Sequence, residues 1–303
     1  MKLFFGILLC VVFFFVIGGP SSFSGLIFHA LWNLGHPLIF AAITFYILKY
    51  HLQSCSHSKR AFIVLIFVII ISLIIELVQE KLNRTFDWLD IFNNTLGSCL
   101  LLMWFFLKHR KQSPLLHAAF VMIMVLLQGF ILIPLYQALK TQYNNHHSFP
   151  TLSLFHDEIE LKKWKGDNIL LIKKKNEFSE YALKVNMLAH KKYNPVTLKH
   201  FSSNWYGFEK LVINIELESK QPIDFCVRIT DIQHDYGEQK YEDRFQKCFK
   251  LSNNPNTINI PLADIIQAPL NRQLDIKHIS EVTLYSHNLV EDLVVYINKI
   301  ELM

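Results

Sequence analysis

Phosphate-binding glycine loops, metal-ligand motifs and a recognisable catalytic nucleophile are all missing from this sequence. No glycine-rich loop occurs in the 303 residues, which excludes a dinucleotide-binding or P-loop enzyme. No two of the five cysteines form a C-x-x-C pair, so no zinc motif and no metal site are expected. Catalysis by paired acids or by a nucleophilic triad cannot be assigned from the sequence, and no cofactor is predicted.

Acidic residues are scarce in the first half of the chain. Residues 1–148 carry 10 of the 30 Lys and Arg residues but only 4 of the 25 Asp and Glu residues, whereas the remainder is close to neutral. The first half is also strongly apolar, which excludes a wholly soluble protein and a disordered one. Its positive charges lie between hydrophobic stretches and not on one surface, so nucleic acid is not an expected partner.

The first half of the chain contains several long hydrophobic runs. A bilayer core needs about 20 helical residues, and we predict membrane spans at about 3–19, 32–50, 61–80, 88–107 and 115–139. The first run has a second interpretation as a cleaved signal peptide, with Lys2 at its charged end. The expected fold of residues 1–142 is an all-α polytopic bundle in the lipid bilayer.

The loops between spans differ in basic residues, which predicts the orientation of the protein. Lys49, Lys59 and Arg60 lie between the second and third spans, and Lys108 and Arg110 between the fourth and fifth. Both loops are therefore expected in the cytoplasm. The resulting prediction is a multi-pass protein of the cell (inner) membrane whose C-terminal domain lies outside.

The second half alternates apolar and polar residues in short segments. We predict a linker at 143–163 and an all-β sandwich at 164–303 with six to eight strands, because such segments bury one face and expose the other. The inward positions are 183/185/187, 211/213/215/217, 225/227/229, 258/260/262, 282/284 and 293/295/297. Trp164 and Trp205 are expected in the core. The fold class is thus multi-domain, a membrane bundle followed by a β-sandwich.

Polar residues interrupt the third and fourth spans at helical spacing. Ionisable groups at membrane depth are costly, so they are expected to face one another or a water-filled cavity. Pro37 suits the first turn of a helix, which favours His36 over His29 as a neighbour of this cluster. The predicted polar cluster consists of His36, Glu76, Gln79, Arg84, Asp87, Asp90 and Asn94.

The residues of this cluster carry a resemblance to a known family. Glu76-Leu-Val-Gln79, followed by Arg84-Thr-Phe-Asp87-Trp-Leu-Asp90 and Asn94-Thr-Leu-Gly97, resembles the VanZ-like membrane proteins over about 24–107. Trp32 stands where that family has an Asp, four residues before His36. The resemblance implies a link to glycopeptide tolerance but no agreed reaction. The residues themselves leave two interpretations open, a structural ion-pair cluster or a site for an anionic envelope ligand.

Residues 164–303 resemble a galactose-binding-like jelly roll, the fold of several carbohydrate-binding modules. The segments that carry the resemblance include Asn204-Trp205-Tyr-Gly207, Tyr241-Glu-Asp243-Arg244, Arg272-Gln-Leu-Asp275 and the closing Tyr296-Ile-Asn298. The resemblance implies a glycan as partner. Modules of this fold often hold a structural calcium ion, for which Asn298 stands where related sequences often have Asp.

Parity within the predicted strands places three polar side chains on an outward face. With Phe225 and Val227 inward, Arg228 points outward, and Arg244 and Tyr285 do so on neighbouring strands. These residues form the candidate ligand face, in which arginines supply hydrogen bonds and tyrosine a platform for a sugar ring. The alternative is an ordinary solvated sheet face.

Two cysteines are placed opposite each other by a hairpin centred on Gly237. Cys226 and Cys248 both occupy outward-facing positions of their predicted strands. An oxidising compartment outside the membrane permits a disulfide between them. Opposed Cβ atoms lie slightly farther apart than a disulfide requires, and a bulge would shift the register, so two free thiols remain an alternative.

These observations lead to three functional hypotheses. The first is a VanZ-like envelope protein that presents a carbohydrate- or protein-binding β-sandwich outside the membrane. The second is a membrane enzyme or carrier acting on a lipid-linked phosphate or envelope precursor through Glu76, Arg84, Asp87 and Asp90. The third is a structural scaffold that docks another envelope protein.

Overall fold

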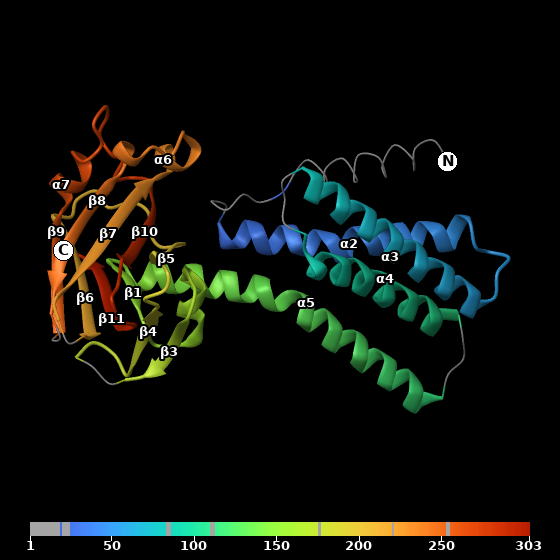
Figure 1. Cartoon of the computed structure of the whole chain (residues 1–303). Helices are drawn as coiled ribbons and strands as arrows, with labels where there is room; N and C mark the ends of the chain where they lie inside the picture. Colours follow the sequence, from blue (N-terminus) through green and yellow to red (C-terminus); the bar gives the residue numbers. More distant parts are fainter. Residues whose placement is uncertain are drawn as a thin grey trace. The chain divides into compact units, whose positions relative to one another are not determined.

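The chain folds into two compact units, of which the second begins at Leu139 (Figure 1). The structure, a computed structural model, describes residues 19, 25–82, 86–109, 113–174, 177–219, 221–252 and 255–303. Apart from Gly19, the predicted span at 3–19 lies outside these residues. Apolar helices make up the described part of the first unit, and β-strands dominate the second.

Four long helices account for the remaining predicted spans. They are α2 (Leu26–Tyr50), α3 (His57–Lys81), α4 (Trp88–His109) and α5 (Pro114–Ser148). Each is long and apolar enough to cross a membrane, and in lipid a helix satisfies its own backbone hydrogen bonds. The helical part of the predicted fold class is confirmed, with helices that extend beyond several of the predicted limits.

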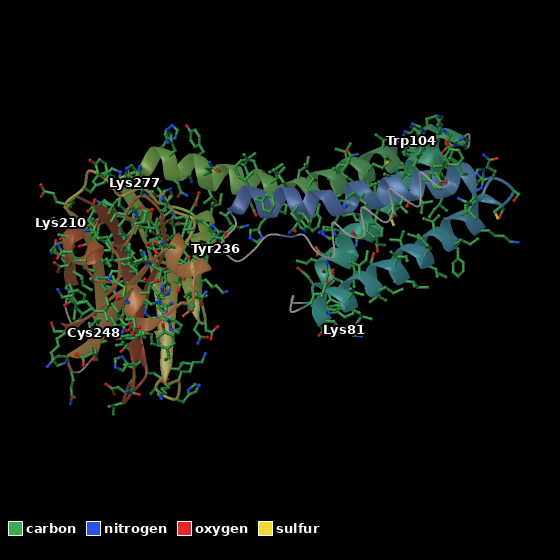
Figure 2. All side chains as sticks on the ribbon, turned by 90° about the horizontal axis from the view of Figure 1, so that it is seen from above. Lys81, Trp104, Lys210, Tyr236, Cys248 and Lys277 are labelled. Carbon is green, nitrogen blue, oxygen red and sulfur yellow. A yellow bond between two sulfur atoms is a disulfide. The ribbon has the colours of Figure 1, made fainter. Side chains whose placement is uncertain are left out.

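Most side chains of these helices are not buried in the unit. A small interior contains Phe40, Val64 and Val68, whereas residues such as Phe62, Ile70 and Trp104 are exposed; Trp104 lies at the surface of α4 (Figure 2). The most apolar window of α5 has no buried residue. So large an exposed apolar surface is suited to lipid and not to water.

Pro37 corrects the predicted start of the second span. It lies inside α2, which begins eleven residues earlier at Leu26, so His29 is helical and not in an outer loop. A Cβ atom built on Gly97 of α4 would lie 2.0 Å from the carbonyl oxygen of Pro37. The backbones of α2 and α4 therefore touch at this point, and the contact requires a residue without a side chain, as at many helix crossings in membranes.

The second unit is a sandwich of two antiparallel sheets, which confirms the β part of the predicted fold class. One sheet has the order β3-β4-β11-β6-β9, with β1 also paired to β11, and the other has the order β2-β5-β10-β7-β8. Neighbours in space are mostly not neighbours in sequence, as in a jelly roll. The strands are β1 (Thr151–Leu154), β2 (Trp164–Gly166), β3 (Ile169–Lys173), β4 (Tyr181–Met187), β5 (Tyr193–Leu198), β6 (Lys210–Glu218), β7 (Ile223–Asp231), β8 (Phe245–Leu251), β9 (Pro255–Pro261), β10 (Ile279–His287) and β11 (Leu293–Leu302).

The core between the sheets contains the side chains that alternation placed inward. All of the inward positions given above are buried, together with Trp164 and Trp205. The described residues form eleven strands, more than the six to eight predicted, because short strands such as β1 and β2 have too few residues to show alternation. Short helices α6 (Ile232–Tyr236) and α7 (Leu262–Ile266) and the 3₁₀ turns η1 (Glu158–Lys163) and η2 (Tyr241–Asp243) connect strands.

The linker predicted at 143–163 is not present as a linker. Helix α5 continues through Ser148, and β1 then pairs with β11. The amide of Asn145 donates to the carbonyl oxygen of His200 at 2.5 Å and accepts from Lys163 at 3.0 Å. This polar segment is thus bonded into the second unit, which begins well before residue 164.

Candidate binding face and buried polar cluster

Strand register assembles a polar face on the outside of the five-stranded sheet. Alternate residues of each strand point away from the core, and the pairing aligns them in rows across the sheet. We call this surface the outer face. One row consists of Lys165 (β2), Thr197 (β5), Thr283 (β10), Arg228 (β7) and Gln246 (β8), and the next of Pro195, Tyr285, Cys226 and Cys248.

Hydrogen bonds fix the middle of the first row. A guanidinium nitrogen of Arg228 donates to Oγ1 of Thr283 at 3.2 Å, and the hydroxyl oxygens of Thr283 and Thr197 lie 3.0 Å apart. Arg228 is thereby held on the sheet through one end of its fork. No hydrogen-bond acceptor reaches its buried Nε atom within the described part of the chain.

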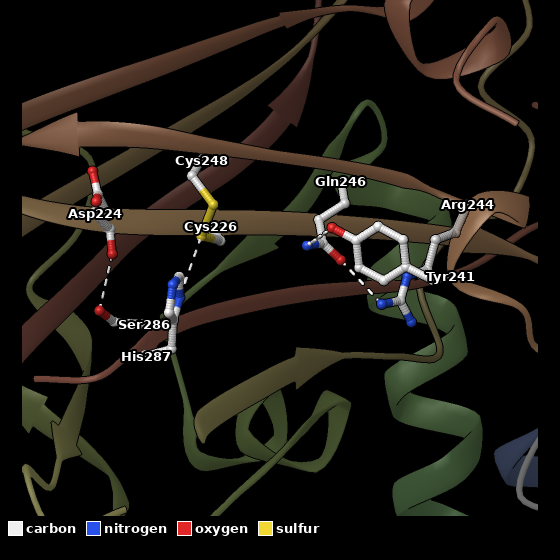
Figure 3. The surroundings of a disulfide bond; sticks show 8 residues. All are labelled: Asp224, Cys226, Tyr241, Arg244, Gln246, Cys248, Ser286 and His287. Atoms are coloured by element: carbon white, nitrogen blue, oxygen red, sulfur yellow. Dashed lines mark hydrogen bonds between the residues drawn. A yellow bond between two sulfur atoms is a disulfide. The ribbon is translucent and has the colours of Figure 1, made fainter. Parts of the chain in front are cut away.

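Arg244 lies just before β8 and is held by its neighbours on the same face. It donates to Oε1 of Gln246 at 3.1 Å, and Gln246 in turn donates to the hydroxyl of Tyr241 at 2.7 Å. The guanidinium carbon stands 4.7 Å from the centre of the Tyr241 ring. Figure 3 shows Tyr241, Gln246 and Arg244 gathered in this way, and the buried Nε of Arg244 has no acceptor among the described residues.

The two arginines are electrostatic neighbours. Burial, followed by the positive charge of Arg228, lowers the pKa of the Arg244 guanidinium from its ordinary value. Burial raises the pKa of Tyr285, with smaller contributions from Tyr193 and Tyr241 that exceed the opposing effect of the arginines. The sequence prediction that Arg228, Arg244 and Tyr285 share one face therefore agrees with their positions in the sheet.

The exposed aromatic rings of the outer face are not the one that the sequence indicated. Tyr285 is only 6% exposed and packs edge-on against Tyr193, with ring centres 4.9 Å apart. Tyr193 and Tyr241 are 41% and 67% exposed, and Tyr236 projects from α6 (Figure 2). Tyr193 was missed because β5 contains Pro195, although burial does alternate over residues 193–196.

Cys226 and Cys248 are joined by a disulfide in the structure (Figure 3). They are directly opposed in the β7–β8 pair, which is the register that a hairpin centred on Gly237 predicts. Cys226 is buried and its sulfur lies 3.9 Å from Nδ1 of His287, whereas Cys248 is exposed at the edge of the sheet. The bond thus joins β7, which carries Arg228, to β8, which begins directly after Arg244.

An ion-pair network holds the connection between β7 and β8. Arg272 donates to both oxygens of Asp231 at 2.5 and 2.8 Å, and to both oxygens of Asp243 at 2.5 and 3.0 Å. Asp231 also accepts from the backbone of His234 and caps α6. The segment that bears Tyr241 and Arg244 is therefore anchored at both of its ends.

An open pocket of about 540 Å³ adjoins the outer face at β2 and β5. Its lining includes Tyr193, Thr197 and Lys165, together with the ion pair of Lys199 and Glu281. These side chains continue the polar surface from the arginines toward the sheet edge. The described residues contain no group of three His, Cys, Asp or Glu side chains that could hold a metal ion.

The helical unit has a buried polar cluster of its own. Nδ1 of His36 lies 3.1 Å from the amide oxygen of Asn94, and Nε2 lies 3.6 Å from a carboxylate oxygen of Asp90. The amide of Asn94 also donates to Ser72 at 3.1 Å. Helices α2, α3 and α4 therefore meet through four polar side chains, one of which, Ser72, the sequence had not indicated.

The other members of the predicted cluster differ in burial. Glu76 is buried and accepts from the backbone N–H of Asp87 at 2.9 Å, and Gln79 is also buried. The side chain of Asp87 is exposed and accepts instead from the N–H of Leu89, because it stands at the start of α4. Arg84 lies outside the described residues.

Comparison with known proteins yields structural likeness only. No family model and no curated protein matches the chain. A family 11 carbohydrate-binding module from Clostridium thermocellum, solved with a β-1,3-1,4-mixed-linked tetrasaccharide, is similar at 13% identity and a TM-score of 0.38, over 50% of this chain and 95% of the module. TmCBM61, in complex with β-1,4-galactotriose, is similar at 13% identity and a TM-score of 0.31, over 46% of this chain and 86% of its own.

An agarase is similar at 13% identity and a TM-score of 0.38 over 50% of this chain. The matched part spans only about a quarter of that enzyme, 26% of its length. With TM-scores this low, the fold of the second unit is defined by its own strand pairings and not by these likenesses.

Proposed function

We propose that this protein is a membrane-anchored carbohydrate-binding protein whose ligand occupies the outer face. The observation that carries the proposal is the gathering of exposed tyrosine rings and partly buried arginines on one regular sheet surface. Flat rings and fixed hydrogen-bond donors are the two kinds of group that a sugar ring needs. A merely solvated sheet face has no need of arginines whose Nε atoms are buried.

Two further features support a binding surface. The disulfide and the Arg272 network hold the strands and the connecting segment that present these side chains, so little conformational freedom is lost when a ligand binds. The adjoining pocket extends the polar surface from the arginines to β2 at the edge of the sheet. Both features suit an extended glycan chain lying across the strands.

The proposal is tested with the full chain in micelles of a sugar-free detergent. We expect at least one polysaccharide from a panel of neutral and acidic glycans to bind. The substitution Tyr193→Ala should lower the affinity for that polysaccharide about tenfold, because tyrosine rings that a ligand covers often dominate the binding free energy. Tyr206→Ala is the matched control, since Tyr206 is 69% exposed in a turn outside the outer face. Absence of binding to every member of the panel would refute the proposal.

The helical unit is proposed to place this module in the cell envelope. We propose a VanZ-like domain with the β-sandwich outside the membrane, supported by the motif residues 76–97 and by the basic loops. A cell-envelope precursor is then an expected neighbour of both units. The scaffold hypothesis predicts instead that a protein, and no glycan, is recovered on the β-sandwich after cross-linking in cells.

A second candidate function rests on the imidazole of His36. Its Nε2 faces Asp90 within a helical unit suited to lipid, an arrangement that can hold or transfer a proton near a lipid-linked phosphate. We propose that Arg84→Lys and His36→Gln abolish binding of undecaprenyl phosphate while the protein remains abundant in the membrane. A structural role predicts that any loss of binding follows protein abundance.

A further inference from the structure

Cations in the β-sandwich are generally matched by carboxylates. Arg272 binds Asp231 and Asp243, Lys163 binds Glu160 at 2.7 Å, and Lys174 binds Glu216 at 2.7 Å. On the outer face itself, Lys199 is paired with Glu281. These four cations thus have counter-ions supplied by the chain.

Arg228 and Arg244 differ from these residues. Among the described residues, neither forms a salt bridge, and they donate hydrogen bonds to the neutral side chains of Thr283 and Gln246. The largest electrostatic effect on Arg244 comes from the like charge of Arg228. Two like charges therefore lie together on a partly buried surface with no compensating anion from the described chain.

Such an arrangement is unfavourable without a ligand. Two neighbouring guanidinium groups repel each other, and burial removes part of the water that would screen them. The arginine forks are also only partly used, since each retains a buried Nε without an acceptor in the described structure. A planar or tetrahedral oxyanion could accept two parallel hydrogen bonds from such a fork and supply the missing charge.

The carboxylates near the outer face are already committed or lie apart. Glu281 is bound by Lys199. Asp235 is buried, and burial raises the pKa of its carboxyl above the ordinary value. Asp224 is exposed two residues from Cys226, on the side of the disulfide away from Arg244 (Figure 3). None of these three therefore serves as the counter-ion of the arginine pair.

From this uncompensated pair we infer that the ligand of the outer face is an anionic glycan, one that carries carboxylate, sulfate or phosphate groups, and that Arg228 and Arg244 bind those groups. The inference rests on the proposed function and specifies its ligand. The exposed rings of Tyr193 and Tyr241 flank the pair and provide surface for the sugar rings between the charged groups.

The experiment measures affinity with the full chain in phosphatidylcholine nanodiscs. The probes are polygalacturonate for carboxylate, dextran sulfate for sulfate, a teichoic acid for phosphate, and dextran and mixed-linkage β-glucan as neutral glycans. We expect an acidic probe to bind at least tenfold more tightly than either neutral one. Its affinity should fall as sodium chloride is raised, because salt screens partly exposed charges.

Substitutions assign the effect to the two arginines. Arg228→Gln and Arg244→Gln should each lower affinity for the acidic probe about tenfold and weaken its salt dependence. Arg244→Lys keeps the charge but not the fork, and should lose part of that affinity with an unchanged melting temperature. Lys247→Gln is the matched control, because it removes a positive charge from β8, three residues after Arg244, at a position that alternation assigns to the other side of the sheet.

The outcomes separate this inference from the proposed function. Equal affinity for neutral and acidic glycans, or unchanged acidic-glycan binding in both glutamine variants, overturns the inference and leaves carbohydrate binding in place. Failure of all glycans overturns both. Preferential binding of phosphatidylglycerol vesicles through the same arginines would assign the surface to a lipid headgroup and also overturn the inference.

Discussion

At the scale of single residues, Gly97 shows most directly how one position determines packing. Its Cβ would lie 2.0 Å from the backbone oxygen of Pro37, and backbone atoms cannot move aside as a flexible side chain can. We expect Gly97→Ala to separate α2 from α4 and to destabilise the helical unit by about 1–3 kcal/mol, the usual cost of overpacking. The measurement is thermal unfolding of the full chain in detergent.

The control for this substitution lies in the same unit. A Cβ on Gly129 of α5 would meet nothing within 4 Å, so Gly129→Ala should leave the melting temperature unchanged or raise it slightly, because alanine favours helix. Equal behaviour of the two variants would show that the α2–α4 contact is not as close as the structure indicates.

Arg272 makes a comparable prediction for the β-sandwich. Asp231 is fully buried, and Arg272→Gln would leave its carboxylate without the charge that compensates it. We expect a loss of about 3–5 kcal/mol, which is typical when one partner of a buried ion pair is removed. Chemical denaturation followed by tryptophan fluorescence measures it, and Lys277→Gln, an exposed cation nearby, should cost little.

The same network predicts how stability depends on pH. Burial alone would raise the pKa of Asp231, but hydrogen bonds from Arg272 and from backbone N–H groups outweigh it and lower the pKa. Hydrogen bonding to Arg272 likewise lowers the pKa of Asp243. Lowered carboxyl pKa values stabilise the fold at neutral pH, and this contribution is lost as the pH falls below about 4, the ordinary value for Asp.

Acid titration of the melting temperature checks this sign. The wild-type β-sandwich should lose stability steeply below about pH 4. The Arg272→Gln variant, in which the two carboxylates gain less on ionisation, should show a shallower decrease over the same interval. A variant as steep as the wild type would mean that other carboxylates dominate acid unfolding.

At the scale of elements, the β7–β8 pair depends on its disulfide. Cys226 and Cys248 are 22 residues apart in sequence, and closing a loop of this length restricts the unfolded chain by about 3 kcal/mol. We expect no alkylatable thiol at either position in unreduced protein from the envelope, whereas Cys55 should react.

The double substitution Cys226→Ser with Cys248→Ser should lower the stability of the sandwich. It should also weaken glycan binding, because both segments that bear the arginines become less constrained.

Mass spectrometry decides the first part of this prediction. Two free thiols at positions 226 and 248 in protein isolated without reductant would contradict the bridge. The matched control for the serine variants is Cys99→Ser in α4, which removes a thiol outside the β-sandwich and should leave glycan binding unchanged.

At the scale of the whole molecule, the orientation of the protein in the membrane is the prediction with most consequence for function. Lys49, Lys59 and Arg60 predict that the loop after α2 is cytoplasmic, and four spans from α2 to α5 then predict that the β-sandwich lies outside. In a protein with Ser at positions 10, 55 and 99, a single cysteine at Ser54 should be protected from an impermeant reagent in intact cells. One at Lys277 should react.

Permeabilised cells provide the control, because both positions are exposed and should then react. Labelling at Ser54 and protection at Lys277 in intact cells would invert the topology. Such a result would place the disulfide in a reducing compartment and remove the envelope glycan as a ligand for the outer face.

The sequence by itself determined the two kinds of fold and the sides of the strands. Hydrophobic runs long enough for a bilayer predict helices wherever they occur, and period-2 alternation predicts which side of a strand is buried. Both patterns are local, so they placed Val227, Leu284 and Val295 in the core without any structure. The same alternation predicted that Arg228, Arg244 and Tyr285 lie on the solvent-facing side of their strands.

Only the tertiary structure decided which of these exterior residues act together. Long-range pairing brings β5, β10 and β7 side by side, so Tyr193 becomes a neighbour of Tyr285 and Thr283 a partner of Arg228. Local composition also misread residues 143–163 as a linker, because the bonds of Asn145 to His200 and Lys163 join segments far apart in sequence. The α2–α4 contact at Pro37 and Gly97 depends likewise on two helices meeting, which no local pattern specifies.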